Sequence, residues 1–342
     1  MPVPPLTLSD RSPDDLPGFR RTFARGRLTL GMGFPIGTRA DDGRVTAPEV
    51  QGELARLAEE AGFAALYARD IPLRVPSFGD VGQIFDPWVF LTHIAARTTR
   101  IALGTAGIVL PVRHPLHVAK SAASLDQISG GRFLLGLASG DRPEEFRAFG
   151  LEQGRRGERF RENVHVLTHA LTTEMRGIRW SGGWMHSADV VPKPSASGLP
   201  LLMVGSCQQS LEYLATHGHG YLTYPRDFDA QRRTAARWRE LVNMTATPDH
   251  RVNDDDGEVF KPFAQSLQID LAEDPAEDAS PIDFGFRVGR RRLVDHLGDL
   301  QRIGVNHVLL GLGASRRPVA EVLHELGEHV LPRFPALEDR AS

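Results

Sequence analysis

The sequence predicts a (β/α)8 barrel with insertions, in the α/β class, and three observations lead to this prediction. Short apolar segments alternate with amphipathic ones, and eight such units lie within about 300 of the 342 residues, which fits a barrel of this kind. The apolar segments are almost continuously hydrophobic, as is typical of parallel strands covered by helices. No GxGxxG motif follows the first strand, so a doubly wound dinucleotide-binding sheet is the less favoured alternative.

The first half of the chain contains four units in which a helical pattern follows a strand. Thr46-Ala47-Pro48-Glu49 has the spacing of a capping box and predicts the start of the first helix, which Gly62 ends. Val118, Ala122 and Leu125 share one face of a later helix. The four strands are expected at residues 28–34, 63–69, 100–110 and 132–138, and two further helices at 87–96 and 155–171.

The second half adds a hairpin and four more strands. The hairpin is expected to turn at residues 181–183 within an insertion after strand 4. Two acidic segments, TPDHRVNDDDGEVF and AEDPAEDASPID, are expected to form loop insertions after strands 6 and 7. The remaining strands are expected at 200–205, 220–224, 263–271 and 305–312. The single barrel domain is therefore expected at residues 28–335, between an N-terminal extension (1–27) and a C-terminal tail (336–342).

The composition narrows the class of protein. With 41% hydrophobic and 24% charged residues the chain can bury a large core. The net charge of −3 gives no electrostatic footprint for nucleic acid or an anionic membrane. The single cysteine, Cys207, excludes an intramolecular disulfide. No signal-peptide pattern and no run of 18 apolar residues occurs, so a cytoplasmic, soluble protein is expected.

Three consecutive predicted strands end in small residues at their carboxyl ends, where barrel enzymes have their active sites. Small residues leave space between strands for a planar ring, and free N–H groups at a helix start bind phosphate. The pattern therefore predicts a phosphorylated aromatic cofactor, whereas tight βα turns and simple helix capping are the alternative explanation. The three ends are Gly104-Thr105-Ala106-Gly107, Ala138-Ser139-Gly140-Asp141 and Gly205-Ser206-Cys207, the last followed by Ser210 in the first turn of a helix.

Two stretches of this sequence resemble the bacterial luciferase-like family of flavin-dependent barrels. They are RIALGTAGIVLPVRHPLHVAKSAASLDQISGGRFLLGLASGDRPEEFRAFG and PLLMVGSCQQSLEYLATHG, and the similarity covers about residues 28–334. RDIPLRVPSFGDVGQIFDPW is similar to an unassigned subgroup of luciferase-type oxidoreductases. The resemblance implies a monooxygenase that uses reduced FMN, supplied by a separate reductase, and dioxygen to oxidise a small organic substrate, as a homodimer. A deazaflavin coenzyme with hydride transfer, or flavin binding without catalysis, are the alternatives.

The resemblance also assigns cofactor contacts by position. Ala106-Gly107, after Thr105, matches a non-prolyl cis peptide that supports the flavin ring in the family. Ser139, before the candidate cofactor contact Gly140, occupies a position where the luciferase α-chain has a phosphate-contacting arginine. The residues that match the phosphate contacts after strand 5 are Gly205, Ser206, Cys207 and Ser210. At the end of strand 2, Ile71 stands where the luciferase has its catalytic histidine, so light-emitting aldehyde chemistry is not supported.

Five charged or titratable residues near predicted strand ends are candidates for chemistry. Asp70 is either a general acid/base or the ion-pair partner of Arg69, and we expect the ion pair. His114 either contacts the flavin or caps a turn. Two arginines are candidate substrate ligands, with solvated loop positions as the alternative: Arg226 and Arg287.

Two other side-chain chemistries, a metal site and a nucleophilic cysteine, are not expected in this protein. The pairs His114/His117 and His165/His169 have helical spacing, but no carboxylate or cysteine cluster accompanies them, so a metal site is not expected. Cys207 is expected in an electropositive turn that lowers its pKa. No general base accompanies it in the sequence, so nucleophilic catalysis is not expected.

Overall fold

The computed structural model describes residues 8–37, 47–78, 85–245 and 259–337, and it contains the predicted barrel. Eight parallel strands follow one another around the barrel in sequence order, and pairing of β10 with β9 and of β13 with β1 closes it. These strands are β1 (Thr29–Gly33), β2 (Ala65–Ala68), β3 (Ala102–Thr105), β5 (Phe133–Ala138), β8 (Leu201–Val204), β9 (Gly220–Thr223), β10 (Phe263–Leu271) and β13 (His307–Gly311).

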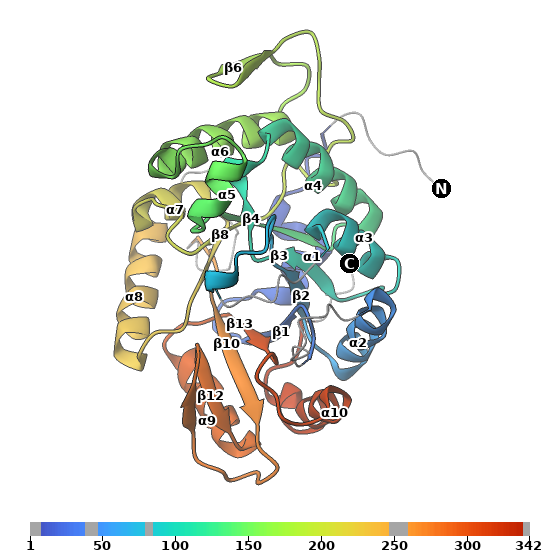
Figure 1. Cartoon of the computed structure of the whole chain (residues 1–342), viewed down its shortest axis with the longest axis vertical. Helices are drawn as coiled ribbons and strands as arrows, with labels where there is room; N and C mark the ends of the chain where they lie inside the picture. Colours follow the sequence, from blue (N-terminus) through green and yellow to red (C-terminus); the bar gives the residue numbers. More distant parts are fainter. Residues whose placement is uncertain (1–7, 38–46, 79–84, 246–258, 338–342) are drawn as a thin grey trace.

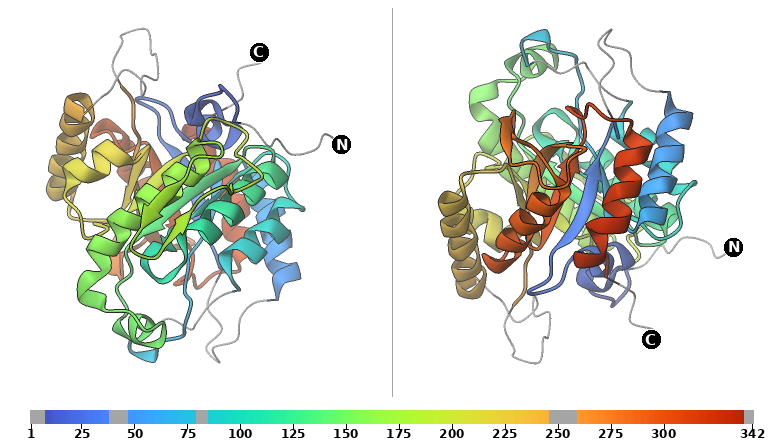
Figure 2. Two further views of the ribbon diagram at one scale, coloured as in Figure 1. Left: turned by 90° about the horizontal axis from the view of Figure 1, so that it is seen from above. Right: turned by 90° about the horizontal axis from the view of Figure 1, so that it is seen from below.

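Helices surround the barrel (Figure 1). In the view from below, α2 and α10 lie side by side across the first strand (Figure 2). None of the described helices is long and apolar enough to cross a membrane. The helices are α1 (Pro17–Thr22), α2 (Pro48–Ala61), α3 (Pro87–Ala95), α4 (Pro115–Ser129), α5 (Pro143–Ala148), α6 (Arg156–Thr172), α7 (Leu211–His217), α8 (Phe228–Thr245), α9 (Arg290–Arg302) and α10 (Val319–His329).

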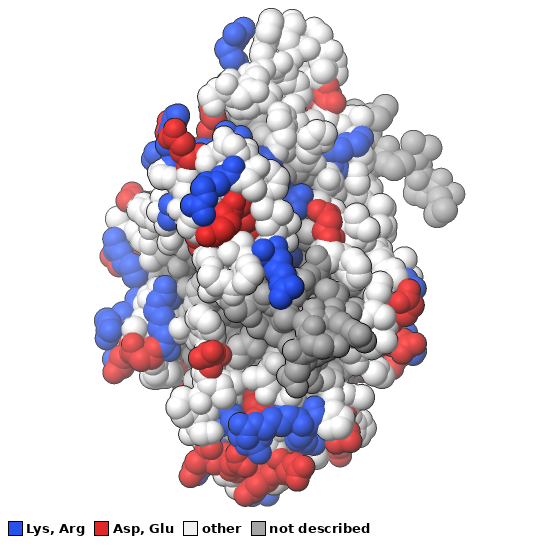
Figure 3. Space-filling view, in the orientation of Figure 1, with Lys and Arg blue, Asp and Glu red and all other residues white. Residues whose placement is uncertain are grey.

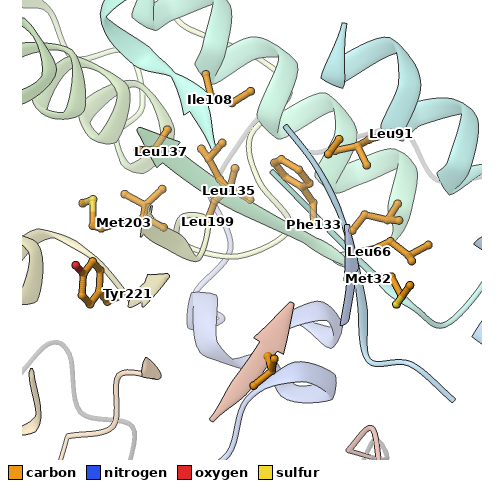
Figure 4. Packing of buried hydrophobic residues seen from close by; sticks show 14 of the residues in the cluster. Met32, Leu66, Leu91, Ile108, Phe133, Leu135, Leu137, Leu199, Met203 and Tyr221 are labelled. Atoms are coloured by element: carbon orange, nitrogen blue, oxygen red, sulfur yellow. The ribbon is translucent and has the colours of Figure 1, made fainter. Parts of the chain in front are cut away.

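Two hydrophobic clusters hold the barrel together. The larger lies between the strands and the helices, where side chains such as Leu66, Phe133 and Met203 pack (Figure 4). The smaller fills the barrel interior with inward-pointing residues of the strands. The predicted N-terminal extension contributes to it, because α1 packs against β2, β3 and β5 and buries Phe19 and Phe23 at this cluster.

Several predicted elements differ from the structure. The first helix begins at Pro48 with Ala47 as its N-cap and no side-chain cap bond, while Thr46 of the predicted capping box lies outside the described residues. The third predicted strand is divided, because β3 ends at Thr105 and a short β4 (Ile108–Val109) pairs with β5. The hairpin β6 (Ile178–Trp180) and β7 (Gly183–Met185) forms as predicted.

The insertion after strand 7 is more ordered than a loop. AEDPAEDASPID was expected to be irregular, but it contributes β11 (Ser280–Ile282), which pairs antiparallel with β12 (Gly285–Val288). β12 in turn extends β10 on the edge that β9 leaves free. The acidic segment predicted as the insertion after strand 6 lies almost entirely outside the described residues.

A neutral histidine is buried in the barrel interior. The Thr29 hydroxyl donates to the Thr22 carbonyl (2.6 Å), so it must accept its second hydrogen bond, at 2.7 Å, from Nδ1–H of His307. Nε2 of His307 therefore carries a lone pair, and no described atom bonds to it. Burial lowers the pKa of His307 from 6.5 to about 3.

This histidine is expected to make the barrel less stable in acid. Below pH 6.5 the unfolded state binds a proton that the folded state excludes, so stability falls as the pH decreases from 6.5 towards 3. At pH 5 the loss from this one group is about 2 kcal/mol. Urea unfolding at pH 7.5 and pH 5 should show this difference in the wild type and a smaller one in His307→Gln, whose amide does not titrate. An unchanged difference in the variant would assign the acid sensitivity to other groups.

Candidate functional site

The three strand ends with small residues lie side by side at one end of the barrel. β3 pairs with β5, and β5 pairs with β8, so their carboxyl ends are consecutive around the rim. The hydroxyl of Thr105 donates to the carbonyl of Gly136 and accepts from its N–H, each at 2.9 Å, which ties β3 to β5. The Thr105 side chain is fully buried and is engaged in the sheet.

The backbone that follows β3 runs close to its neighbours. The Ala106–Gly107 peptide is cis, and the N–H of Ala106 donates to the Ala68 carbonyl at 2.8 Å. A Cβ on Gly107 would lie 2.9 Å from both the carbonyl carbon of Gly136 and Cγ2 of Val204. The glycine is therefore required by the packing of the barrel wall. Ala106 is partly exposed at this position, so its surface is available to a ligand.

The segment after β8 forms a tight turn with free backbone donors. Gly205, Cys207 and Gln208 all have positive φ, at 68°, 49° and 56°. Ser210 is the N-cap of α7 rather than a first-turn residue, and its Oγ accepts from Tyr213 N at 3.2 Å. Among the described atoms, none accepts from the N–H groups of Ser206 and Cys207. These donors suit an anion with several oxygen atoms.

The thiol of Cys207 is not activated. Its side chain is 1% exposed, and Sγ lies within 3.3 Å of the Val204 carbonyl and 3.4 Å of the Leu137 carbonyl. Burial raises the pKa of Cys207 to about 12. The expectation of a lowered pKa is therefore wrong, because the positive-φ turn directs the side chain into the core instead of towards solvent. Cys207 can contribute its backbone to a ligand, not its sulfur.

Arg156, which was not among the candidates predicted from the sequence, precedes a residue that contacts this turn. Gly157 at the start of α6 accepts a hydrogen bond from Gln209 Nε2 at 2.8 Å, and a Cβ on it would lie 3.0 Å from Cβ of Gln208. The preceding residue, Arg156, has a buried Nε with no partner among the described residues. Its Nη1 donates to the Gln153 carbonyl at 3.0 Å. In the sequence, the run RRGER that contains Arg156 could be recognised only as part of a basic helix.

The end of β5 contacts the segment that follows β2. Ser139 is buried, and Gly140 has φ of 76°, where a Cβ would lie 2.6 Å from Cγ1 of Val109. Beyond it, Arg142 lies over the Phe78 ring at 5.2 Å. Glu145 accepts from Leu73 N at 3.4 Å, and burial is the main cause that raises its pKa. Neither Arg142 nor Glu145 was among the candidates predicted from the sequence, although both lie within four residues of one of the three small-residue strand ends.

Asp70 forms a different ion pair from the one expected. Its carboxylate is bound by Arg113 through Nε at 2.8 Å and Nη2 at 2.7 Å, and it accepts from Val109 N at 3.0 Å. The expected pairing with the adjacent Arg69 is therefore wrong. Arg69 is exposed, because successive residues of an extended chain point to opposite sides.

His114 caps a helix and lines a pocket. Its Nδ1 accepts from Leu116 N at 3.3 Å at the start of α4, so the capping role is present. Burial, together with the charges of His117 and Arg159, lowers its pKa, so the ring is neutral near pH 7. It borders a pocket of about 450 Å³ with Asp70, Arg113 and Trp88. A contact between His114 and a cofactor stays a prediction.

The two candidate substrate arginines lie farther around the rim. Arg226, after β9, donates to Oγ1 of Thr223 at 2.8 Å and to the amide oxygen of buried Gln231 at 3.3 Å. Arg287 lies within β12 and binds Asp270 at 2.9 Å and Glu277 at 2.7 Å. Basic and acidic side chains gather at the end of the molecule where β12 and α9 lie (Figures 1 and 3). The charge of Arg287 is thus neutralised by two carboxylates. Among the described residues, Arg226 donates hydrogen bonds only to neutral oxygen atoms.

Comparison with known proteins places the chain in a family. The model of the luciferase-like monooxygenase family matches residues 28–253. A 4-hydroxyprotoasukamycin monooxygenase of Streptomyces nodosus is 31% identical over 201 residues, which cover 57% of this chain and 53% of that protein. The chain thus spans about half the length of this relative.

Solved structures share the fold at low sequence identity. An F420-dependent secondary alcohol dehydrogenase, solved with an F420–acetone adduct, is similar with a TM-score of 0.70 and 16% identity, covering 92% of this chain and 100% of that one. The oxygenating constituent of 3,6-diketocamphane monooxygenase from Pseudomonas putida, solved with FMN, gives 0.69 and 14%, covering 90% and 99%. The family match, together with the barrel and its three small-residue strand ends, shows that the chain belongs to the luciferase-like monooxygenase family and is an oxidoreductase.

Proposed function

We propose that the protein is an FMN-dependent monooxygenase that uses reduced FMN and dioxygen to oxidise a small organic substrate. The observation that carries this proposal is the turn at residues 205–210, whose free N–H groups lie beside the small-residue ends of β3 and β5. An anion site next to an unfilled rim suits a phosphate joined to a planar ring. The monooxygenase relative and the FMN complex of the same fold support this choice of cofactor and reaction.

The residues present fit both parts of FMN, its phosphate and its ring. The phosphate would accept from the N–H groups of Ser206 and Cys207 and from the hydroxyls of Ser206 and Ser210, with Arg156 supplying the positive charge that Ser139 lacks. The ring would lie against Ala106–Gly107 at the ends of β3 and β5. A phosphate bound by several such donors gains about 1.5–3 kcal/mol from each hydrogen bond to its charge.

The protein's own contribution to the reaction is positioning and exclusion of water. When bound, FMN supplies the redox chemistry and the reaction with dioxygen. The chain would hold the phosphate at the turn and fix the backbone under the ring, and residues 71–78, which contact Arg142 and Glu145, would cover the rim. Arg226 would meet an anionic or polar group of the substrate, because its charge has no carboxylate partner among the described residues.

Two protein partners complete the proposal. A separate flavin reductase would supply the reduced cofactor, and the protein would act as a homodimer. Sedimentation velocity of the purified protein tests the second point: a single species of monomer mass would contradict it.

The phosphate contacts can be tested by replacing both hydroxyls. Ser206→Ala/Ser210→Ala is expected to weaken FMN binding by at least about tenfold, because two hydrogen bonds to a charged group are lost. Riboflavin is the matched control ligand, since it has the same ring without the phosphate, and its affinity should stay within about twofold. Loss of the Ser210 N-cap costs about 1 kcal/mol of stability, so titrations are made well below the melting temperature. Equal losses for both ligands would place the phosphate elsewhere.

The function itself is tested by turnover. Purified protein is titrated with FMN, reduced FMN and the deazaflavin coenzyme, and oxygen consumption is then followed with NADH and a flavin reductase over a substrate panel. Preference for reduced FMN and substrate-dependent oxygen uptake is the expected result. Binding of the deazaflavin coenzyme alone would indicate hydride transfer instead, and flavin binding without turnover on any substrate would indicate a binding protein.

A further inference from the structure

The backbone after β3 is fixed from two points at the end of β2. The N–H of Ala106 donates to the main-chain carbonyl of Ala68, at 2.8 Å. Three residues later, the N–H of Val109 donates to the side chain of Asp70, at 3.0 Å. The Ala106–Gly107 peptide lies between these two bonds. Its geometry therefore depends on one main-chain acceptor and one side-chain acceptor of the same strand end.

The opposite side of this segment leaves no freedom for a compensating shift. Gly107 lies so close to Gly136 and Val204 that even a Cβ would approach them to 2.9 Å. Ile108 and Val109 also pair with Leu137 and Ala138 of β5. The segment therefore cannot shift towards β5 and β8, and its hydrogen bond to the Asp70 carboxylate opposes movement away from the end of β2.

Arg113 holds the carboxylate of Asp70 in place. It binds both oxygen atoms of Asp70, at 2.7 and 2.8 Å, and one oxygen of Asp86 at 3.0 Å. Burial acts against the Arg113 cation, but the bonds and charges of Asp70 and Asp86 outweigh it and raise the pKa of Arg113. The Asp70 side chain is 1% exposed, so water cannot readily replace either partner.

We propose that Asp70 is a positioning residue that fixes the Ala106–Val109 backbone under the flavin ring, and that Arg113 holds it in the orientation this requires. The proposal rests on the proposed function, since the ring is placed there by that assignment. Asp70 acts through the backbone and does not exchange a proton with substrate. Its loss frees the Val109 amide and leaves Arg113 with Asp86 alone.

The chain contains a matched control for this test. Asp270 at the end of β10 has the same side-chain exposure of 1%, and it also binds an arginine, Arg287, at 2.9 Å. It lies on the other side of the barrel from β3. Asp70→Ala and Asp270→Ala thus remove equivalent buried ion pairs at different places. Both are expected to lower the melting temperature. Only Asp70→Ala should also change the Ala106–Val109 backbone on which the flavin ring is proposed to lie.

Three measurements on the full chain separate the two variants. The dissociation constant for oxidised FMN should rise by about tenfold or more in Asp70→Ala, because the backbone under the ring is no longer held in place, and should stay within about twofold in Asp270→Ala. The visible absorption of bound FMN should shift only in Asp70→Ala. Deuterium exchange of peptides that contain residues 106–113 should increase in Asp70→Ala, whereas Asp270→Ala should increase exchange around residues 268–288.

A rescue variant distinguishes positioning from proton transfer. Asp70→Asn/Arg113→Gln replaces the ion pair by two amides, and the Asn oxygen can still accept from Val109 N. FMN affinity, the absorption of bound FMN and turnover should return to within about threefold of the wild type if position is what matters, since removing both charges of a pair avoids the cost of one unpaired charge. Recovered FMN affinity with turnover still abolished would overturn the proposal in favour of an acid/base role.

Three further results would contradict the positioning role, the proposed function or both. Unchanged deuterium exchange at residues 106–113 in Asp70→Ala would overturn the proposed contact whatever the flavin does. Wild-type protein that binds no FMN would refute the proposed function and the positioning role together. If the wild type binds FMN and Asp70→Ala binds it equally well, only the positioning role fails.

Discussion

Replacing Gly136 by alanine is expected to destabilise the barrel strongly. The new Cβ would overlap the main-chain carbonyl oxygen of Thr105, and it would lie 3.2 Å from Cγ2 of Val204. Thr105 cannot retreat, because its hydroxyl bonds both the N–H and the carbonyl of Gly136. Overpacking at a rigid backbone contact costs about 3 kcal/mol or more, against a total stability of about 5–15 kcal/mol.

Gly154→Ala provides the control for this substitution. A Cβ at Gly154 has no neighbour within 4 Å, and the backbone there has no positive φ. Its effect should stay within about 0.5 kcal/mol, the usual range for a surface change. Chemical denaturation followed by far-UV circular dichroism compares the two variants. A Gly136→Ala protein with nearly normal stability would show that β3 and β5 can separate without cost.

Replacing Arg156 by glutamine should have the largest effect of any single side chain on FMN affinity. We place the phosphate at the 205–210 turn, beside Gly157, and Arg156 has no carboxylate partner among the described residues. An arginine bound to a phosphate contributes both charge and a fork of donors. Its loss should weaken FMN binding by about 10- to 100-fold.

The neighbouring Arg155→Gln is the matched control. Arg155 is 68% exposed at its side chain and pairs with Glu158 at 3.1 Å, so its removal should leave FMN affinity within about twofold. Riboflavin affinity should be unaffected in both variants. If the two arginine variants lose FMN affinity equally, the effect is one of general surface charge and Arg156 does not contact the phosphate.

The strand positions and the clustering of the three small-residue strand ends could be predicted from the sequence for clear physical reasons. Apolar runs that are buried on both faces identify strands whatever their partners are. In a parallel barrel the strands follow the chain order, so the small-residue ends of β3, β5 and β8 had to be neighbours. The hairpin and the barrel class follow from equally local patterns.

Contacts between distant residues could not be predicted in this way. Asp70 was expected to pair with the adjacent Arg69, but it binds Arg113, which is 43 residues away in the sequence. The pKa of Cys207 was expected to fall, yet the turn buries the thiol. β11 and β12 form in a segment whose acidic composition is typical of a loop, because the free edge of β10 accepts an additional strand.

The sequence by itself determined the barrel, the order of its strands and the rim at which three neighbouring strands end in small residues. Periodicity and residue size are local properties, and a parallel closed sheet converts them directly into positions. Only the tertiary structure decided which charges meet, why Gly107 and Gly136 carry no side chain, and that the start of α6, next to Arg156, contacts the turn at residues 205–210. These features depend on distances of a few ångströms between segments that are far apart in the chain, and such distances are fixed by packing.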